Sequence, residues 1–451
     1  IIMNTYTAIS IGPIYKTLTM ARKPLEIWAA SYLFSYLMDC IIQSIPESSL
    51  ISPAKLKETT NDYGLYPDRV YMRGEINADS VLDTALNDFK AKTKLPIDYF
   101  NRMSVKVENI TDDKTAIKTL NNKLDALELY SNPAGNASYK VVRDFLINEG
   151  EVFGIDHSNY RDLETIAKAG RDVTFSYDKY ICVVQADGDG VGQVVSNIST
   201  DDLSKTISPA LLQFGKDAVG EIKKFGGFPI YAGGDDLLFI APVVGKSGDN
   251  IFKLITQIDK KFKPVQTAAE TLNNDFKTSM SYGVSISYYK FPLYEALKTA
   301  VSLLFDTAKS IDGKNAIAWK LQKHSGSTVE GQLSKADETM YSLFEQLIAK
   351  SNVDEGLLSS IAFKIKANKA VLDTFFSNKN WLSARIGSFY ENFIDNTDDY
   401  ANCTQQILAT LLEHEMNKTK KDVTQVVTQL YGMLRTAKFI NGENIKEEEE
   451  N

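Results

Sequence analysis

Two adjacent carboxylates interrupt an apolar stretch of the chain. The segment YAGGDDLLFIAP, residues 231–242, places Asp235 and Asp236 directly after two glycines. Glycine reaches positive φ without steric cost, so Gly233 and Gly234 between two apolar runs predict a hairpin turn. Aspartate is also common in solvated turns, and for this stretch alone that ordinary interpretation stays open.

A second acidic motif lies one predicted helix upstream. Residues 179–187, KYICVVQAD, are typical of a strand that ends at Asp187, and Asp189 follows in ADGDG. In a ferredoxin-like sheet the third strand lies between the first two, so the hairpin turn falls beside the end of the first strand. We therefore expect Asp187, Asp235 and Asp236 to converge. Crowded like charges are costly without a cation, and hard oxygen ligands suit Mg²⁺ or Mn²⁺.

The elements that hold these acids follow the order β-α-β-β-α-β, with one extra helix and one extra strand. This order is typical of the split βαβ, or ferredoxin-like, fold. We assign it to a domain at 172–325. Its expected strands cover 179–187, 228–232, 237–242, 278–289 and 315–322, and its helices cover 202–225, 250–262 and 293–310.

Two further domains flank this one. Residues 1–171 are expected to form an α+β domain, and residues 326–451 a helical bundle that follows a linker at 323–332. The bundle carries apolar residues at helical spacing and no catalytic constellation, so we expect it to dock on a neighbouring subunit and the rest to fold without it. The first domain is expected to hold strands at 5–13, 66–74 and 102–110 and a turn-rich loop at 130–138.

Composition restricts the function classes. The 451 residues are 43% hydrophobic and 24% charged with a net charge of −8, whereas a free-standing nucleic-acid binder would be basic. Three scattered cysteines and three histidines do not support a disulfide scaffold, a four-cysteine zinc site or a histidine-rich nuclease. Residues 25–42 are apolar but carry Ser31, Ser35 and Asp39 on one stripe, which predicts an amphipathic helix, not a membrane span. We find no signal peptide and expect a cytoplasmic protein.

Two lysines follow the last long helix of the second domain. Lys309 and Lys314 stand in AKSIDGKNA, where the glycine turns the chain back toward the sheet. Their positive charge can reach a bound triphosphate. Each lysine alone is also compatible with an ordinary solvated surface position.

Taken together, these motifs resemble the large, palm-containing subunit of type III CRISPR effector complexes of the Cmr kind. The resemblance covers residues 1 to about 320 and lies in the order of the motifs rather than in GGDD alone. The matching stretches are IGP at 11–13, ARK at 21–23, EIWAAS at 26–31, ADGDGVG at 186–192, GGDD at 233–236, YKFPLYEAL at 289–297 and AKSIDGKNA at 308–316.

The resemblance implies an α+β chain with two ferredoxin-like palm domains that face each other, plus a C-terminal α-helical bundle. It implies a nucleotidyltransferase that uses ATP when guide RNA pairs with target RNA in a complex with other Cmr-type subunits. The product would be a nucleotide second messenger, with release of pyrophosphate. The residues it implies are Asp187, Asp235 and Asp236 as metal ligands, and Gly233, Gly234, Ser281, Lys309 and Lys314 around the nucleotide, with Ser281 at the base.

Two departures from many relatives bear on the product. The chain begins at the first palm without an HD nuclease domain, and it lacks the cysteines of a zinc element, so we do not expect DNA cleavage. The acceptor is either a second ATP, giving cyclic oligoadenylate, or S-adenosylmethionine, giving an AMP conjugate. A sulfonium and an ammonium favour carboxylates, and Asp68 and Glu151 are the candidate acids in the first palm.

Two other functions remain open. A stand-alone diguanylate-cyclase-like enzyme shares the palm and a similar hairpin, but it does not need the first domain or the bundle. A scaffold with a silent palm would hold guide RNA and neighbouring subunits without chemistry. Incubation with ATP, with and without the assembled complex and target RNA, separates these functions.

Overall fold

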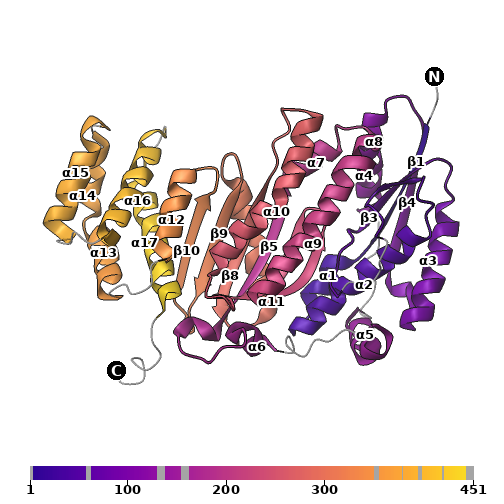
Figure 1. Cartoon of the computed structure of the whole chain (residues 1–451), viewed down its shortest axis with the longest axis horizontal. Coiled ribbons are helices and arrows are strands. Elements are labelled where there is room, and N and C mark those ends of the chain that lie inside the picture. Colours follow the sequence, from indigo (N-terminus) through magenta and orange to yellow (C-terminus); the bar gives the residue numbers. More distant parts are fainter. Residues whose placement is uncertain are drawn as a thin grey trace.

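The chain is elongated, and its three parts follow one another along the long axis (Figure 1). The first domain lies at one end, the second sheet lies in the middle, and the C-terminal helices lie at the other end. The computed structural model describes residues 4–56, 62–129, 138–153, 162–349, 355–377, 379–394, 399–418 and 421–442. The expected loop at 130–138 lies almost wholly outside these residues.

The first domain is a complete ferredoxin-like unit. Its antiparallel sheet has the order β2-β3-β1-β4, with α2 connecting β1 to β2 and α3 connecting β3 to β4. The three predicted strands are confirmed, and the short β2 was not foreseen. The elements are β1 (Asn4–Gly12), α1 (Ile14–Met20), α2 (Pro24–Gln43), β2 (Leu50–Ser52), β3 (Arg69–Arg73), α3 (Ala78–Thr93), β4 (Asn101–Ile110), α4 (Ala116–Glu128), α5 (Ser138–Phe153) and α6 (Leu163–Lys168).

Helix α2 is buried on nearly all sides, and its predicted polar stripe of Ser31, Ser35 and Asp39 is buried as well. The helix is long and apolar enough to cross a membrane, but 89% of its most apolar window is buried within the protein. The polar residues serve the backbone of a neighbouring loop, since Ser35 Oγ accepts hydrogen bonds from the N–H groups of Leu65 (2.7 Å) and Tyr66 (2.9 Å). The helix is therefore an element of the protein core.

The second domain contains the predicted sheet. Strand β7 lies between β5 and β6, as the ferredoxin-like order requires, and the whole sheet has the order β10-β9-β8-β5-β7-β6. Its elements are β5 (Tyr180–Asp189), α7 (Val191–Val195), α8 (Thr200–Asp202), a π-turn at Leu203–Ile207, α9 (Ser208–Phe225), β6 (Phe228–Gly233), β7 (Asp236–Pro242), α10 (Ile251–Leu272), β8 (Ser279–Tyr288), α11 (Leu293–Ser302), π-turn η6 (Leu303–Thr307), 3-10 turn η7 (Ala308–Ser310), β9 (Ala316–Gln322) and β10 (Thr328–Ser334).

The two faces of this sheet belong to different cores. On β5, Cys182 and Val184 belong to the core formed with α9 and α10. Ile181 and Val183 point the other way, into the core formed with α11 and with α2 of the first domain. Because side chains alternate along a strand, Asp187 continues the second series and faces the first domain.

The segment predicted as a linker at 323–332 includes the first part of β10, which pairs antiparallel with β9.

The helices that follow share the core of the second sheet, since the rings of Phe252 and Trp319 each lie 5.1 Å from that of Phe344 on α12. Trp319 Nε1 also donates to Thr436 Oγ1 on α17 (2.9 Å). The C-terminal helices are therefore not independent of the second palm, which contradicts our expectation that the rest folds without them. They are α12 (Glu338–Ala349), α13 (Glu355–Ala367), α14 (Lys369–Asp373), α15 (Leu382–Phe389), α16 (Asp399–Met416) and α17 (Val423–Asn441).

Candidate active site

The acidic hairpin has a two-residue turn. Gly233 pairs with Asp236 across the hairpin, so Gly234 and Asp235 form the turn itself. Gly234 has a φ of 67°, which favours glycine at the first central position of such a turn. Asp235 therefore lies at the tip, and Asp236 is the first residue of β7. The turn predicted from the two glycines is confirmed.

Glycine is also required in the strand opposite this turn. A Cβ at Gly188 would lie 2.6 Å from Asp235 Oδ2 and 2.7 Å from Asp235 Cβ. Any larger residue would push the turn away from β5. Gly188 thus permits the close approach of the hairpin to the end of β5, a role that the sequence alone did not reveal.

The structure brings the three expected carboxylates together. One carboxylate oxygen from each of Asp187, Asp235 and Asp236 lies within 4.8 Å of the others. Burial, with a contribution from Asp189, raises the pKa of Asp235 to about 6. Burial and the neighbouring Asp235 raise the pKa of Asp236 well above its usual range. Such crowded, partly desolvated oxygens are the donor set that a divalent cation would stabilise, so the residues fit a Mg²⁺ or Mn²⁺ ion.

Lys309 lies among these acids. Its Nζ forms an ion pair with Asp187, lies 3.6 Å from Asp189 Oδ1 and donates to the carbonyl of Gly188 (3.2 Å). The lysine is carried on η7, directly after the π-turn η6. Gly283 on β8 lets η6 rest on the sheet, because a Cβ there would lie 2.5 Å from the backbone nitrogen of Leu304. Lys314, in the same motif, is exposed and has a φ of 53°.

Asp189 is a buried acid that ties this segment to the sheet. Its Oδ2 accepts hydrogen bonds from Ser279 Oγ (2.8 Å), Ser281 Oγ (2.7 Å) and the backbone N–H of Asn315 (3.0 Å). Ser281 is fully buried, and a side chain with no accessible surface does not line a base pocket. The expectation for Ser281 is therefore corrected: it supports Asp189.

The same loop is bonded to a buried lysine that lies between β10 and α12. The backbone N–H of Lys335 donates to the carbonyl of Asn315 (2.7 Å), while its Nζ pairs with Asp259 Oδ2 (2.6 Å) on α10. Tyr282 OH donates to the other oxygen of Asp259 (2.8 Å). The order of the loop at 311–315 thus depends on residues at the start of the C-terminal region.

A cavity of about 660 Å³ lies between the two domains. Asp236 of the second sheet and Asp68 of the first domain both line it. Burial raises the pKa of Asp68. Tyr15 and Phe305, 60% and 50% exposed, contribute aromatic rings from opposite sides of the domain boundary. Asp68 therefore shares one cavity with Asp236, and its contact with an acceptor stays a prediction.

Glu151 is not part of the described lining. It lies in α5, and its side chain is outside the part of the chain that the structure describes.

Gly233 allows the Tyr231 hydroxyl to approach, because a Cβ there would lie 2.3 Å from that oxygen. Tyr231 also lines the cavity. The predicted nucleotide contacts of Gly233 and Gly234 remain predictions.

The ferredoxin-like fold, with the acidic hairpin beside Asp187 of β5, defines a palm domain of the polymerase and cyclase class. Two sequence profiles match the chain: "Cas10/Cmr2, second palm domain" over residues 180–318, and "CRISPR-associated protein Cmr2, N-terminal" over residues 6–88. Residues 180–318 therefore resemble a Cas10/Cmr2 second palm domain, and residues 6–88 resemble the N-terminal region of Cmr2.

Individual relatives agree with this assignment. The chain is 32% identical over 198 residues to the CRISPR system Cmr subunit Cmr2 of Pyrococcus furiosus, a match that covers 38% of this chain and 22% of that protein. Its fold is similar to a chain in the Type III-B Cmr-beta apo structure, with a TM-score of 0.64, 12% identity, and coverage of 96% and 82% of the two chains. It is also similar to a chain in the Csm1-Csm4 cassette in complex with cA4, with a TM-score of 0.53, 13% identity, and coverage of 97% and 70%.

Proposed function

We propose that this chain is the nucleotidyltransferase subunit of a type III CRISPR effector complex. It acts in the cytoplasm with other Cmr-type subunits, guide RNA and target RNA, and makes a nucleotide second messenger from ATP. The observation that carries the proposal is the convergence of Asp187, Asp235 and Asp236 within 4.8 Å at the edge of a cavity between two palms. A divalent cation bound there would polarise the reacting phosphate and lower the pKa of the attacking hydroxyl.

The chain's own residues supply the remaining parts of the reaction. An acceptor hydroxyl oxygen attacks the α-phosphorus of ATP and releases its proton to water, the bond from that phosphorus to the bridging oxygen breaks, and pyrophosphate leaves with the electron pair. Asp187, Asp235 and Asp236 hold the cation, and Lys309 and Lys314 neutralise the leaving phosphates. Tyr15 and Phe305 offer exposed rings on which nucleoside bases stack.

The charge of the cavity favours a cationic acceptor. Among the described residues, its lining contains the carboxylates of Asp68, Glu128 and Asp236 and one basic side chain, Lys16. Glu128 is engaged by Arg69 at 3.0 Å, which leaves the half-buried Asp68 as the acid that the first palm offers to the cavity. A triphosphate would be repelled there, whereas the sulfonium and ammonium groups of S-adenosylmethionine would be attracted. We therefore propose S-adenosylmethionine as the acceptor and an AMP conjugate as the product, in preference to cyclic oligoadenylate. Glu151 remains a second candidate for this contact.

The test is a product analysis of the assembled complex. The complex is incubated with ATP, and S-adenosylmethionine, target RNA and the metal (Mg²⁺ or Mn²⁺) are each added or left out. The products are identified by mass spectrometry. We expect an AMP–S-adenosylmethionine conjugate only when target RNA and metal are present. No nucleotide product under any condition would favour the silent scaffold, and a cyclic dinucleotide made from GTP by the chain alone would favour the diguanylate-cyclase-like alternative.

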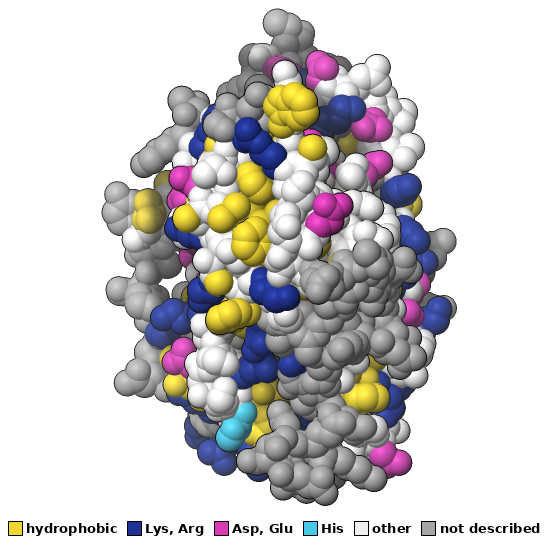
Figure 2. All heavy atoms as spheres, turned by 90° about the vertical axis from the view of Figure 1, so that its left-hand side faces the viewer, with side chains coloured by type: hydrophobic (Ala, Val, Ile, Leu, Met, Phe, Trp, Pro, Cys, Tyr) yellow, Lys and Arg dark blue, Asp and Glu magenta, His cyan; other side chains and the backbone are white. Residues whose placement is uncertain are grey.

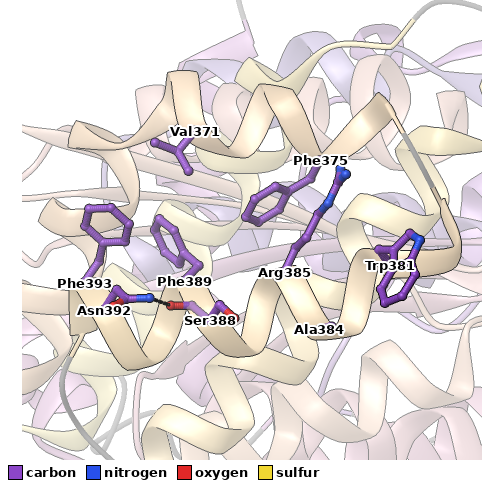
Figure 3. A pocket seen from close by; sticks show the side chains of 9 residues that line it. All are labelled: Val371, Phe375, Trp381, Ala384, Arg385, Ser388, Phe389, Asn392 and Phe393. Atoms are coloured by element: carbon purple, nitrogen blue, oxygen red, sulfur yellow. Dashed lines mark hydrogen bonds between the residues drawn. The ribbon is translucent and has the colours of Figure 1, made fainter.

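We propose that the outer end of the C-terminal helices is the docking surface for a neighbouring protein subunit. Phe363 and Trp381 are 72% and 62% exposed in this region. Figure 2 shows apolar side chains gathered on this end of the molecule with Lys and Arg beside them. A cavity of about 550 Å³ opens here, and Figure 3 shows aromatic side chains, including Phe389, Phe393 and Trp381, along it. Exposed apolar surface of this kind marks an interaction site.

A further inference from the structure

The position of Lys309 is unusual for a residue that binds phosphate. Its ammonium group does not extend into the cavity but pairs with Asp187, one of the three converging carboxylates. The side chain is only 15% exposed. A buried ammonium at that place neutralises a carboxylate that a divalent cation would need. Lys309 and a divalent cation therefore compete for Asp187.

A second carboxylate is in position to receive the lysine. Asp189 Oδ1 is buried and has no hydrogen-bond partner among the described residues, and it lies 3.6 Å from Lys309 Nζ. The other oxygen of Asp189 is already used by three donors. A buried carboxylate oxygen without a donor is costly, so the approach of Lys309 to Asp189 would be favourable.

The backbone of the segment that carries Lys309 is fixed, whereas the Lys309 side chain can pair with either of the two carboxylates. Asn315 binds Asp189 through its backbone N–H, and η6 rests on β8 at Gly283. The backbone of the loop is thus fixed at both ends of the motif. Only rotation about the side-chain bonds of Lys309 is needed to move the ammonium from one carboxylate to the other.

We propose that Lys309 neutralises Asp187 while the site holds no divalent metal, and that Lys309 pairs with Asp189 when a divalent metal binds. Before loading, Lys309 pairs with Asp187. On loading, Lys309 moves to Asp189 Oδ1 and presents its remaining donors to the phosphates of ATP. Asp189 is then a positioning residue that acts through Lys309. This inference rests on the proposed metal site.

The test measures Mn²⁺ binding to the purified chain without nucleotide, by electron paramagnetic resonance or calorimetry. We expect Lys309→Ala to bind Mn²⁺ about tenfold more tightly than wild type, because a competing cation worth about 1.4 kcal/mol is gone. Lys309→Arg, which keeps the charge, and Lys298→Ala, which removes an exposed charge from α11, should bind as wild type does. Unchanged or weaker Mn²⁺ binding by Lys309→Ala would overturn the proposal. Absence of Mn²⁺ binding to both wild type and Lys309→Ala would instead overturn the proposed metal site.

A double-mutant cycle on ATP affinity tests the role of Asp189. Asp189→Asn should weaken ATP binding in the presence of Mn²⁺ in the wild-type background and have no further effect in Lys309→Ala, because Asp189 acts through Lys309. Ser281→Ala removes one hydrogen bond to Asp189 without changing its charge and controls for local packing. Additive losses in the two backgrounds would show that Asp189 does not act through Lys309. A thermal melt of each variant verifies that it is folded.

Discussion

Asp68 and Asp236 lie on different domains yet line the same cavity. Asp68 immediately precedes β3 of the first sheet, and Asp236 begins β7 of the second. Their charges are close enough for Asp68 to contribute to the raised pKa of Asp236. The cavity therefore brings the acid proposed for acceptor binding beside the acids proposed for metal binding, although Asp68 and Asp236 lie 168 positions apart in the sequence.

Replacing both hairpin acids should stop product synthesis. Asp235→Asn with Asp236→Asn removes two of three metal ligands, and we expect a loss of about a hundredfold or more in rate, measured as pyrophosphate release by the assembled complex. Complex assembly should be unaffected because both residues lie at a turn. Asp275→Asn, an exposed acid outside the site, is the matched control. A double variant that consumes ATP at the wild-type rate would show that the metal-site assignment is wrong.

The stability of the metal-free protein should fall as the pH rises through the range from about 4 to about 6. The pKa of Asp235 is raised from 3.8 to about 6 in the folded state, so between these values the folded chain binds more protons than the unfolded chain. Added Mg²⁺ binds the ionised form and should therefore raise the melting temperature more at pH 7.5 than at pH 5. Thermal melts at both pH values check this, with Asp235→Asn as the control. An equal Mg²⁺ effect at the two pH values in wild type would contradict it.

Asp68→Asn should discriminate between the two acceptors. Removal of its charge should raise the KM for S-adenosylmethionine about tenfold while the KM for ATP changes little, since one lost charge contact is worth about 1.4 kcal/mol. Both constants are measured from AMP-conjugate formation by the assembled complex. Robust cyclic oligoadenylate from ATP alone, unchanged by added S-adenosylmethionine, would reject this acceptor.

The exposed rings at the cavity should contribute to nucleoside binding. Phe305→Ala is expected to weaken ATP binding by about 1–3 kcal/mol, the usual value of one base–aromatic stack, whereas Phe305→Tyr should retain it. Phe363→Ala, a change of the same size at a remote exposed position, is the control. Equal ATP affinity of Phe305→Ala and wild type would remove this ring from the site.

Assembly is best tested with surface variants rather than a truncation. Deleting the chain after Lys335 would expose Trp319 and Phe252, which pack against α12 and each other, so such a deletion should unfold the second palm. Trp381→Ser with Phe363→Ser should instead leave the melting temperature near wild type and reduce co-purification with the other subunits. Normal yield of the complex from this double variant would reject the proposed docking surface.

The hairpin and the meeting of its acids with Asp187 were predictable because they depend on local turn chemistry and strand order. Gly233 and Gly234 specify the turn, and the order of elements places it beside β5. The role of Ser281 was not predictable, since it depends on the register that sets Asp187 opposite Ser281 and Asp189 opposite Ser279. Strand β10 was missed because its buried Val329 and Leu333 are separated by polar residues and glycine.

The bond from Lys335 to Asn315 has a consequence for regulation. Asn315 contacts Asp189 through its N–H and Lys335 through its carbonyl. One peptide segment therefore connects the proposed nucleotide site to the start of the C-terminal region. Binding equilibria linked through a common element are reciprocal. If docking of a subunit on the C-terminal helices tightens ATP binding by some factor, then ATP must tighten docking by that same factor, and a cell rich in ATP would hold the complex together more firmly.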